Sequence, residues 1–304
     1  MTNRLVMIGF SALRAILLVL GITVLIFVLV RVVPGDVVDL LGIEGGLTED
    51  AKQQMRQELG LDRSQAEQLL IWLGRVAQGE LGLSIRFQRP VADLILRALP
   101  TTLALAFWSF VIGLTLAIGV AVAAVIWPRS PLPALVNAIN VWSIAMPTFC
   151  AGILGILVFV LWLGWMPLLG NMILPSLIIG IDVAGQIVKP LHEDLKETAT
   201  APYVRTAHAK GLGRAAIVWR HILPNSLSVV IALSGLVLTG LVGGTITMEV
   251  LFGLPGIGKL ALDSVLGRDY PTIQAVAVLL AASVVIINAA TGIVARLLDP
   301  RLKT

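Results

Sequence analysis

The histidines and the cysteine of this sequence are the residue types that could do chemistry, but their spacing does not suit it. His192, His208 and His221 lie 16 and 13 residues apart with no cysteine beside them, which is not the spacing of metal ligands. Cys150 is the only cysteine and lies inside an apolar run, so no disulfide can form within the chain. Neither a Gly-x-Ser-x-Gly elbow nor a His-Glu-x-x-His motif occurs. We therefore expect no metal site, no cofactor and no enzyme active site.

A glycine-rich run at residues 253–259 has the outline of a phosphate-binding loop. It ends in Gly258-Lys259, but Leu260 stands where such a loop needs a Ser or Thr hydroxyl for Mg²⁺. No strand pattern precedes the run. We interpret it as a tight turn after a helix, and we expect any ATP chemistry to come from another protein.

Asp182 is a candidate functional acid because it lies in an otherwise uncharged apolar stretch. Ionisable residues within membrane helices are costly and usually face a cavity or a partner. Asp182, Gln186, Lys189 and Glu193 are spaced 4, 3 and 4 residues apart, which places them on one helical face. Asp182 and Gln186 are therefore either part of a translocation path or part of a polar seam between helices, and the spacing favours neither.

A basic segment at residues 189–224 contains all three histidines of the chain. Pro202 suits the first turn of a short helix, and Lys210 and Gly211 suit its end. The small residues Thr206, Ala207 and Ala209 would let this helix enter a groove of a partner. A second helix is predicted from about Arg214 until Pro224 stops it. Composition alone favours an ordinary solvated basic loop over a docking element.

The elements that must position these residues are membrane helices. The chain is 57% hydrophobic and 13% charged, whereas a soluble protein carries roughly a quarter charged residues. Uncharged stretches of about 20 residues can each span a bilayer as a helix. They predict an all-α membrane protein with spans at about 9–33, 100–127, 134–163, 172–188, 225–248 and 270–296. The first stretch has no cleavage site after it and is read as an uncleaved helix.

Charge distribution predicts the orientation of these spans. With both termini in the cytosol, the inside segments hold 12 cations and four acids, while the outside segments hold ten cations and 13 acids. The excess of Lys and Arg inside follows the positive-inside rule. The basic pI of about 9.6 is then a signal of topology and does not indicate nucleic acid binding.

Residues 34–99 are too polar to span and predict a small helical insertion on the outer side. Thr48 can cap a helix that ends near Gly60, and Ser64 with Glu67 forms a capping box for the next helix. On the fifth span, Gly235, Thr239 and Gly243, with the pair Gly240 and Gly244, let another helix approach closely. That helix can belong to this chain or to a second subunit at the pore.

The order of several short motifs resembles the dipeptide/oligopeptide/nickel permease family of ABC importers. The basic segment is similar to the family's coupling loop in an Ala-x-x-x-Gly core and a Leu-Pro ending. The other matching pieces lie at 32–36, 59–63, 82–84, 89–91, 249–258, 268–271 and 298–301. The loop residues that carry the resemblance are Tyr203, Arg205, Thr206, Ala207, Lys210, Gly211, Leu223 and Pro224. Pro202 and His208 depart from the usual pattern, as do Lys189 and His192.

The resemblance implies a six-helix type I importer domain over residues 1–304 in a bacterial inner membrane. It also implies two ATP-binding subunits docked at 189–224, a second homologous permease that makes a heterodimer, and an extracytoplasmic solute-binding protein. Di- or oligopeptides are the implied cargo, with a nickel chelate or glutathione as alternatives. An ion-coupled secondary transporter is the competing class, although such folds usually show internal repeats and several intramembrane charges. A membrane enzyme is the third class, and the lack of a catalytic constellation disfavours it.

Overall fold

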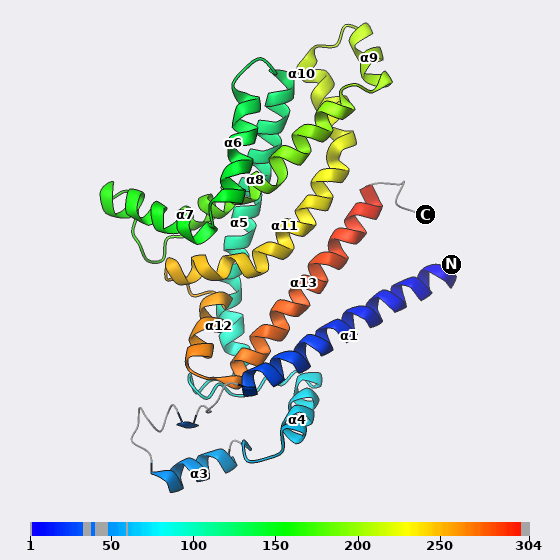
Figure 1. Cartoon of the computed structure of the whole chain (residues 1–304). Coiled ribbons are helices and arrows are strands. Elements are labelled where there is room, and N and C mark those ends of the chain that lie inside the picture. The colour runs from blue at the N-terminus through cyan, green and yellow to red at the C-terminus, as the bar shows by residue number, and fades with distance from the viewer. Residues whose placement is uncertain (1, 33–37, 40–47, 59, 299–304) are drawn as a thin grey trace. The chain divides into compact units, whose positions relative to one another are not determined.

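The computed structural model describes residues 2–32, 38–39, 48–58 and 60–298, and side chains outside 2–12 and 295–298. Helices make up 81% of the chain, and the described part contains no strand beyond one isolated bridge between Leu83 and Pro90. The all-helical prediction is confirmed (Figure 1). The helices are α1 (Thr2–Val32), α3 (Glu49–Glu58), α4 (Gln65–Ala77), α5 (Val91–Ile126), α6 (Leu132–Ala145), α7 (Thr148–Gly155), η1 (Ile156–Trp162), α8 (Ile173–Thr198), α9 (Pro202–Ala209), α10 (Arg214–Ile217), η2 (Val218–Ile222), α11 (Leu223–Leu251), α12 (Ile257–Leu266) and α13 (Tyr270–Leu298).

The chain forms two compact units. Unit 1 comprises Met1–Pro100 and Pro255–Val285, and unit 2 comprises Thr101–Leu254 and Ile286–Thr304. Among the described residues, five helices are long and apolar enough to cross a membrane: Leu13–Val32, Val91–Ile126, Ile173–Thr198, Arg214–Leu251 and Tyr270–Val294. A sixth crossing is present if the bent pair α6 and α7–η1 counts as one span.

The stretch predicted as a span at 134–163 is bent in the structure. α6 ends at Ala145, and the next helical segment leaves it at an angle of 102°. Pro147 causes this break because a residue before proline is pushed out of the α region. Met146 is accordingly extended, with φ −106° and ψ 107°.

α8 extends beyond the predicted span at 172–188, to Thr198, with Pro190 inside it. One predicted helix end differs from the structure. Pro224 does not stop a helix, because it lies in the first turn of α11, where the missing N–H is tolerated. The five-residue π-helix η2 joins α10 to α11, so that one helical segment runs over Arg214–Leu251.

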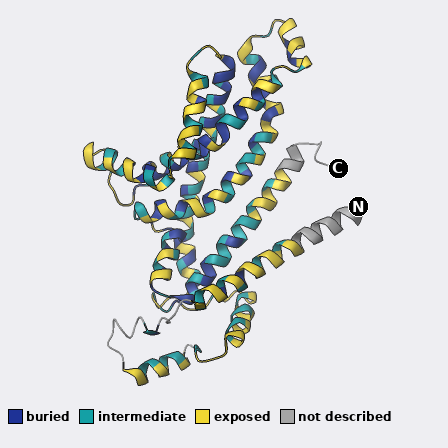
Figure 2. Cartoon of the chain, in the orientation of Figure 1, coloured by how far each residue is buried: buried dark blue, intermediate teal, exposed yellow. Residues whose placement is uncertain are grey.

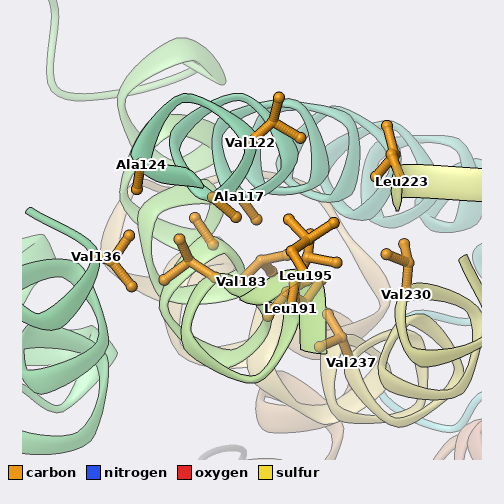
Figure 3. Close-up of a cluster of buried hydrophobic side chains, with 14 of the residues drawn as sticks. Ala117, Val122, Ala124, Val136, Val183, Leu191, Leu195, Leu223, Val230 and Val237 are labelled. Atoms are coloured by element: carbon orange, nitrogen blue, oxygen red, sulfur yellow. The ribbon is translucent and has the colours of Figure 1, made fainter. Parts of the chain in front are cut away.

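The core of unit 2 forms where α5, α8 and α11 meet. Figure 3 shows Ala117 and Val122 near Val183, Leu191 and Leu195, with Val230 and Val237 beyond them. Figure 2 shows the same buried stripe along these helices. Gly113 permits the close approach of α5 to α8, because a Cβ there would lie 2.4 Å from Val183 Cγ1. The buried face of α8 therefore positions the polar residues on its other face.

The helical insertion of unit 1 has the local structure that the sequence predicts. Thr48 Oγ1 accepts a hydrogen bond from the Ala51 N–H at the start of α3. Gly60, which follows the end of α3, has a φ of +66°. Ser64 and Glu67 form the predicted capping box of α4. Arg31 at the end of α1 donates to Gln68 Oε1 at 2.6 Å, which ties α4 to α1.

Candidate functional site

The short helix α9 has the limits that the sequence predicts. It begins at Pro202, which needs no N–H partner there, and its C-cap is Lys210. Gly211 follows with a φ of +80°, a conformation that glycine adopts without strain. The Gly211 N–H donates to the His208 carbonyl at 2.9 Å, which closes the helix end. The result is a two-turn rigid element in the middle of the basic segment.

α9 has one buried and one exposed face. Val204 and Ala207 are 2% and 5% exposed and belong to the buried cluster of unit 2. On the exposed face lie Tyr203, Arg205, Thr206, His208 and Lys210. The burial of Ala207 corrects the expectation that its small side chain faces a partner. Ala207 instead lets α9 lie close to its own protein, and so anchors the exposed face.

The exposed charged side chains of α9 and of the segment that follows it are basic, with no acid among them. Arg205, Lys210, Arg214 and Arg220 are all exposed, and no acid occurs between Thr198 and Met248. Of the predicted Leu-Pro ending, Leu223 is buried and Pro224 is exposed. The segment therefore offers several cations to an acidic partner, and the same stretch of chain contains no carboxylate that could compete for them.

Asp182 and Gln186 lie next to each other on α8, as their spacing predicts. The Gln186 Nε2 donates to Asp182 Oδ2 at 3.0 Å, and Ser143 Oγ of α6 donates to Asp182 Oδ1 at 2.7 Å. Asn140 Nδ2 of α6 donates to the Gly185 carbonyl at 2.9 Å. Asp182 is half-buried and Gln186 is exposed. These bonds are those of a polar seam between α6 and α8, while the exposure of Gln186 is what a path-lining residue needs.

Sequence reasoning missed two fully buried acids. Glu249, near the end of α11, accepts a hydrogen bond from Thr102 Oγ1 of α5 at 2.7 Å. In unit 1, Asp269 accepts hydrogen bonds from Ser84 Oγ at 2.5 Å, the Ile85 N–H at 3.1 Å and Thr272 Oγ1 at 2.7 Å. Both acids fall within the motif pieces 249–258 and 268–271, and that was the only sequence signal for them.

The glycine-rich run at 253–259 is a turn between two helices. α11 precedes it, Gly253 has a φ of +63°, and α12 begins at Ile257, so Lys259 lies inside a helix. A phosphate-binding loop follows a strand, and here a helix stands in that place. Among the described residues, no group of three or more His, Cys, Asp and Glu could hold a metal ion.

Residues 109–304 match the protein family described as "Binding-protein-dependent transport system inner membrane component". The chain belongs to this family. It is 33% identical to the oligopeptide transport system permease protein AppB of Bacillus subtilis (strain 168), over 96% of this chain and 97% of the relative. It is 34% identical to the glutathione transport system permease protein GsiC of Escherichia coli (strain K12), over 93% and 94%. The protein is thus an inner-membrane permease subunit of an ABC importer.

A solved structure supports the fold of the permease. The inward-facing MetNI methionine ABC transporter matches 68% of this chain and 97% of its own, with a TM-score of 0.57 and 20% sequence identity. This likeness is in fold only. A permease of this family works with ATPase subunits and a binding protein, and the relatives are themselves permease components of transport systems.

Proposed function

We propose that this permease imports di- or oligopeptides, and that α9 is the helix through which ATP hydrolysis in partner subunits moves it. The observation that supports the coupling role is that α9 has one buried face and one exposed face. Val204 and Ala207 fix it to the core of unit 2, while Tyr203, Arg205, Thr206, Lys210 and Gly211 remain exposed. A rigid helix transmits a displacement that a floppy loop would absorb.

The pore partner is the second part of the proposal. On α11, Gly235 packs within the chain, since a Cβ there would lie 2.3 Å from Thr291 Cγ2. Gly240, Gly243 and Gly244 instead have nothing within 4 Å of an added Cβ. Small residues with an open face suit close contact with another helix. We assign this face to a second, homologous permease, and we expect a heterodimer.

Orientation and ATP chemistry complete the proposal. Both termini and residues 189–224 lie in the cytosol, and the insertion at 34–99 lies outside, where the solute-binding protein docks. ATP is hydrolysed by two partner subunits, because the glycine-rich turn of this chain lacks the strand and the hydroxyl of a phosphate-binding loop. Peptide cargo is favoured by the oligopeptide relative, and glutathione, itself a small peptide, is the second candidate because GsiC is equally similar.

The test of coupling uses Gly211 in the assembled transporter. The substitution Gly211→Val forces a β-branched residue into a left-handed conformation, where no neighbour within 4 Å adds a clash. Gly211→Asn is the matched control, because asparagine tolerates that conformation. We expect Gly211→Val to abolish peptide-stimulated ATP hydrolysis while the subunits still fold, and Gly211→Asn to retain most of it. Normal stimulation in Gly211→Val would refute the role of α9.

Energy source and cargo are tested in vesicles that contain the complete transporter. Uptake of a labelled peptide should survive an uncoupler and stop without ATP. Uptake that follows the ion gradient instead would indicate a secondary transporter. Competition by unlabelled oligopeptide, glutathione and a nickel chelate then ranks the three candidate substrates.

A further inference from the structure

An open hollow in unit 2 takes one residue, Arg214, from the basic segment at 189–224 and otherwise lies outside the coupling helix α9. It has a volume of about 540 Å³ and is formed by the turn between α5 and α6 together with the start of α10. Its lining residues are Ile126, Trp127, Pro128, Arg129, Ser130 and Arg214. We propose that this hollow binds the phosphate headgroup of an anionic phospholipid of the inner leaflet.

The turn that carries Arg129 has a defined shape. Ser130 Oγ donates to the Trp127 carbonyl at 2.6 Å and accepts from the Leu132 N–H at 3.3 Å. The Ser130 backbone N–H also donates to the Trp127 carbonyl, at 3.1 Å. These three bonds hold the backbone that carries Arg129, and Arg214 lines the same hollow.

Among the described residues, no acid lines the hollow that could pair with its two arginines. No acid occurs from residue 94 to residue 181, or from Thr198 to Met248, the two stretches that form the hollow. The acids at the end of α8, Glu193, Asp194 and Glu197, do not line it. Two guanidinium groups that face one space are a typical phosphate-binding arrangement, since each offers a planar fork of donors.

The apolar part of the lining favours a lipid over a soluble phosphate or a protein carboxylate. Ile126 and Trp127 stand at the end of α5, where its long uncharged stretch stops. Trp127 is 58% exposed, and tryptophan prefers the level of the lipid headgroups. Basic pockets between membrane helices on the cytoplasmic side are known to bind anionic headgroups. A lipid satisfies both halves of this hollow, with its phosphate on the arginines and its glycerol region against the indole.

This site shares with the proposed function the cytosolic placement of the turn at 127–130 and one residue, Arg214, of the basic segment at 189–224. Lipid binding by the purified chain needs no ATPase subunit, no binding protein and no peptide. A failure of the lipid test therefore leaves the coupling role of α9 untouched, and an uncoupled Gly211→Val variant leaves the lipid site untouched.

The experiment is native mass spectrometry of the full chain in detergent. Phosphatidylglycerol is titrated in one series, phosphatidylcholine in a second, and inorganic phosphate is added as a competitor in a third. The test variant is Arg129→Gln combined with Arg214→Gln, and the control is Arg220→Gln, which removes an exposed cation outside the hollow. The melting temperature in the same detergent checks that each variant is folded.

We expect phosphatidylglycerol to bind more tightly than phosphatidylcholine, and the double variant to lose about tenfold or more of that affinity. Arg220→Gln should bind as the unchanged chain does. Unchanged phosphatidylglycerol binding in a folded double variant would overturn the proposal, as would displacement of the lipid by equimolar inorganic phosphate.

Discussion

The exposed helix α9 and the buried Asp269 cluster place their charges in opposite environments. The cations of α9 are exposed, and only the apolar residues Val204 and Ala207 hold the helix in place. Asp269 is fully buried and accepts three hydrogen bonds, from Ser84 Oγ, the Ile85 N–H and Thr272 Oγ1. Charges of the first kind are available to partners, whereas a charge of the second kind holds two distant stretches of the chain together. Substitutions should therefore separate cleanly into those that affect coupling and those that affect folding.

The largest loss of stability is expected for Asp269→Ala. It leaves the donors of Ser84, Ile85 and Thr272 without their acceptor, and each buried donor left unsatisfied costs about 1–3 kcal/mol. Thermal unfolding in detergent should show a large fall in melting temperature. Asp263→Ala is the control, because that acid of α12 is only half-buried. Equal melting temperatures for the two variants would show that the buried acid contributes no more to stability than the half-buried one, which would contradict the distinction drawn above.

A smaller loss of stability is expected for Gly113→Ala. The added Cβ would lie 2.4 Å from Val183 Cγ1 and 2.7 Å from the Gly180 carbonyl oxygen, and overpacking of this kind costs about 1–3 kcal/mol. Gly119→Ala on the same helix has nothing within 4 Å and should be neutral or slightly stabilising. The melting temperatures of the pair measure how tightly α5 packs on α8. A neutral Gly113→Ala would contradict that close packing.

The smallest effect on stability is expected for Asp182→Ala. Ser143 and Gln186 lose their shared acceptor at a half-buried site, for a cost of about 1 kcal/mol. Transport by the variant decides between the two roles of Asp182. Unchanged peptide uptake would assign it to the seam between α6 and α8, and a loss of uptake with near-normal stability would assign it to the translocation path.

Local features of the fold could be read from the sequence. Pro202 and Gly211 fixed the limits of α9, and Ser64 with Glu67 fixed the start of α4, because capping and proline effects act within a few residues. The apolar segments could also be found by counting charges, because the lack of charge is a property of each segment by itself. These elements can therefore be predicted without knowing which distant parts of the chain come into contact.

Features that depend on distant contacts could not be read in this way. Asp269 and Ser84 are 185 residues apart, and no local pattern pairs them. Ala207 looked like a surface residue because its helix is polar overall, and only the packing of unit 2 makes it buried. The break at Pro147 was overlooked because the surrounding stretch lacks charges, although the preference of a residue before proline could have revealed it.

The most direct test of the account is a photo-crosslink from α9 to the ATPase subunits. In one variant of the assembled transporter, Tyr203 is replaced by benzoylphenylalanine. In a matched variant the same replacement is made at Trp165, an exposed aromatic residue between η1 and α8. We predict that the label at 203 crosslinks to an ATPase subunit in the absence of peptide, and that the label at 165 does not. A crosslink to the ATPase from 165 and none from 203 would contradict the assignment of α9 as the coupling helix.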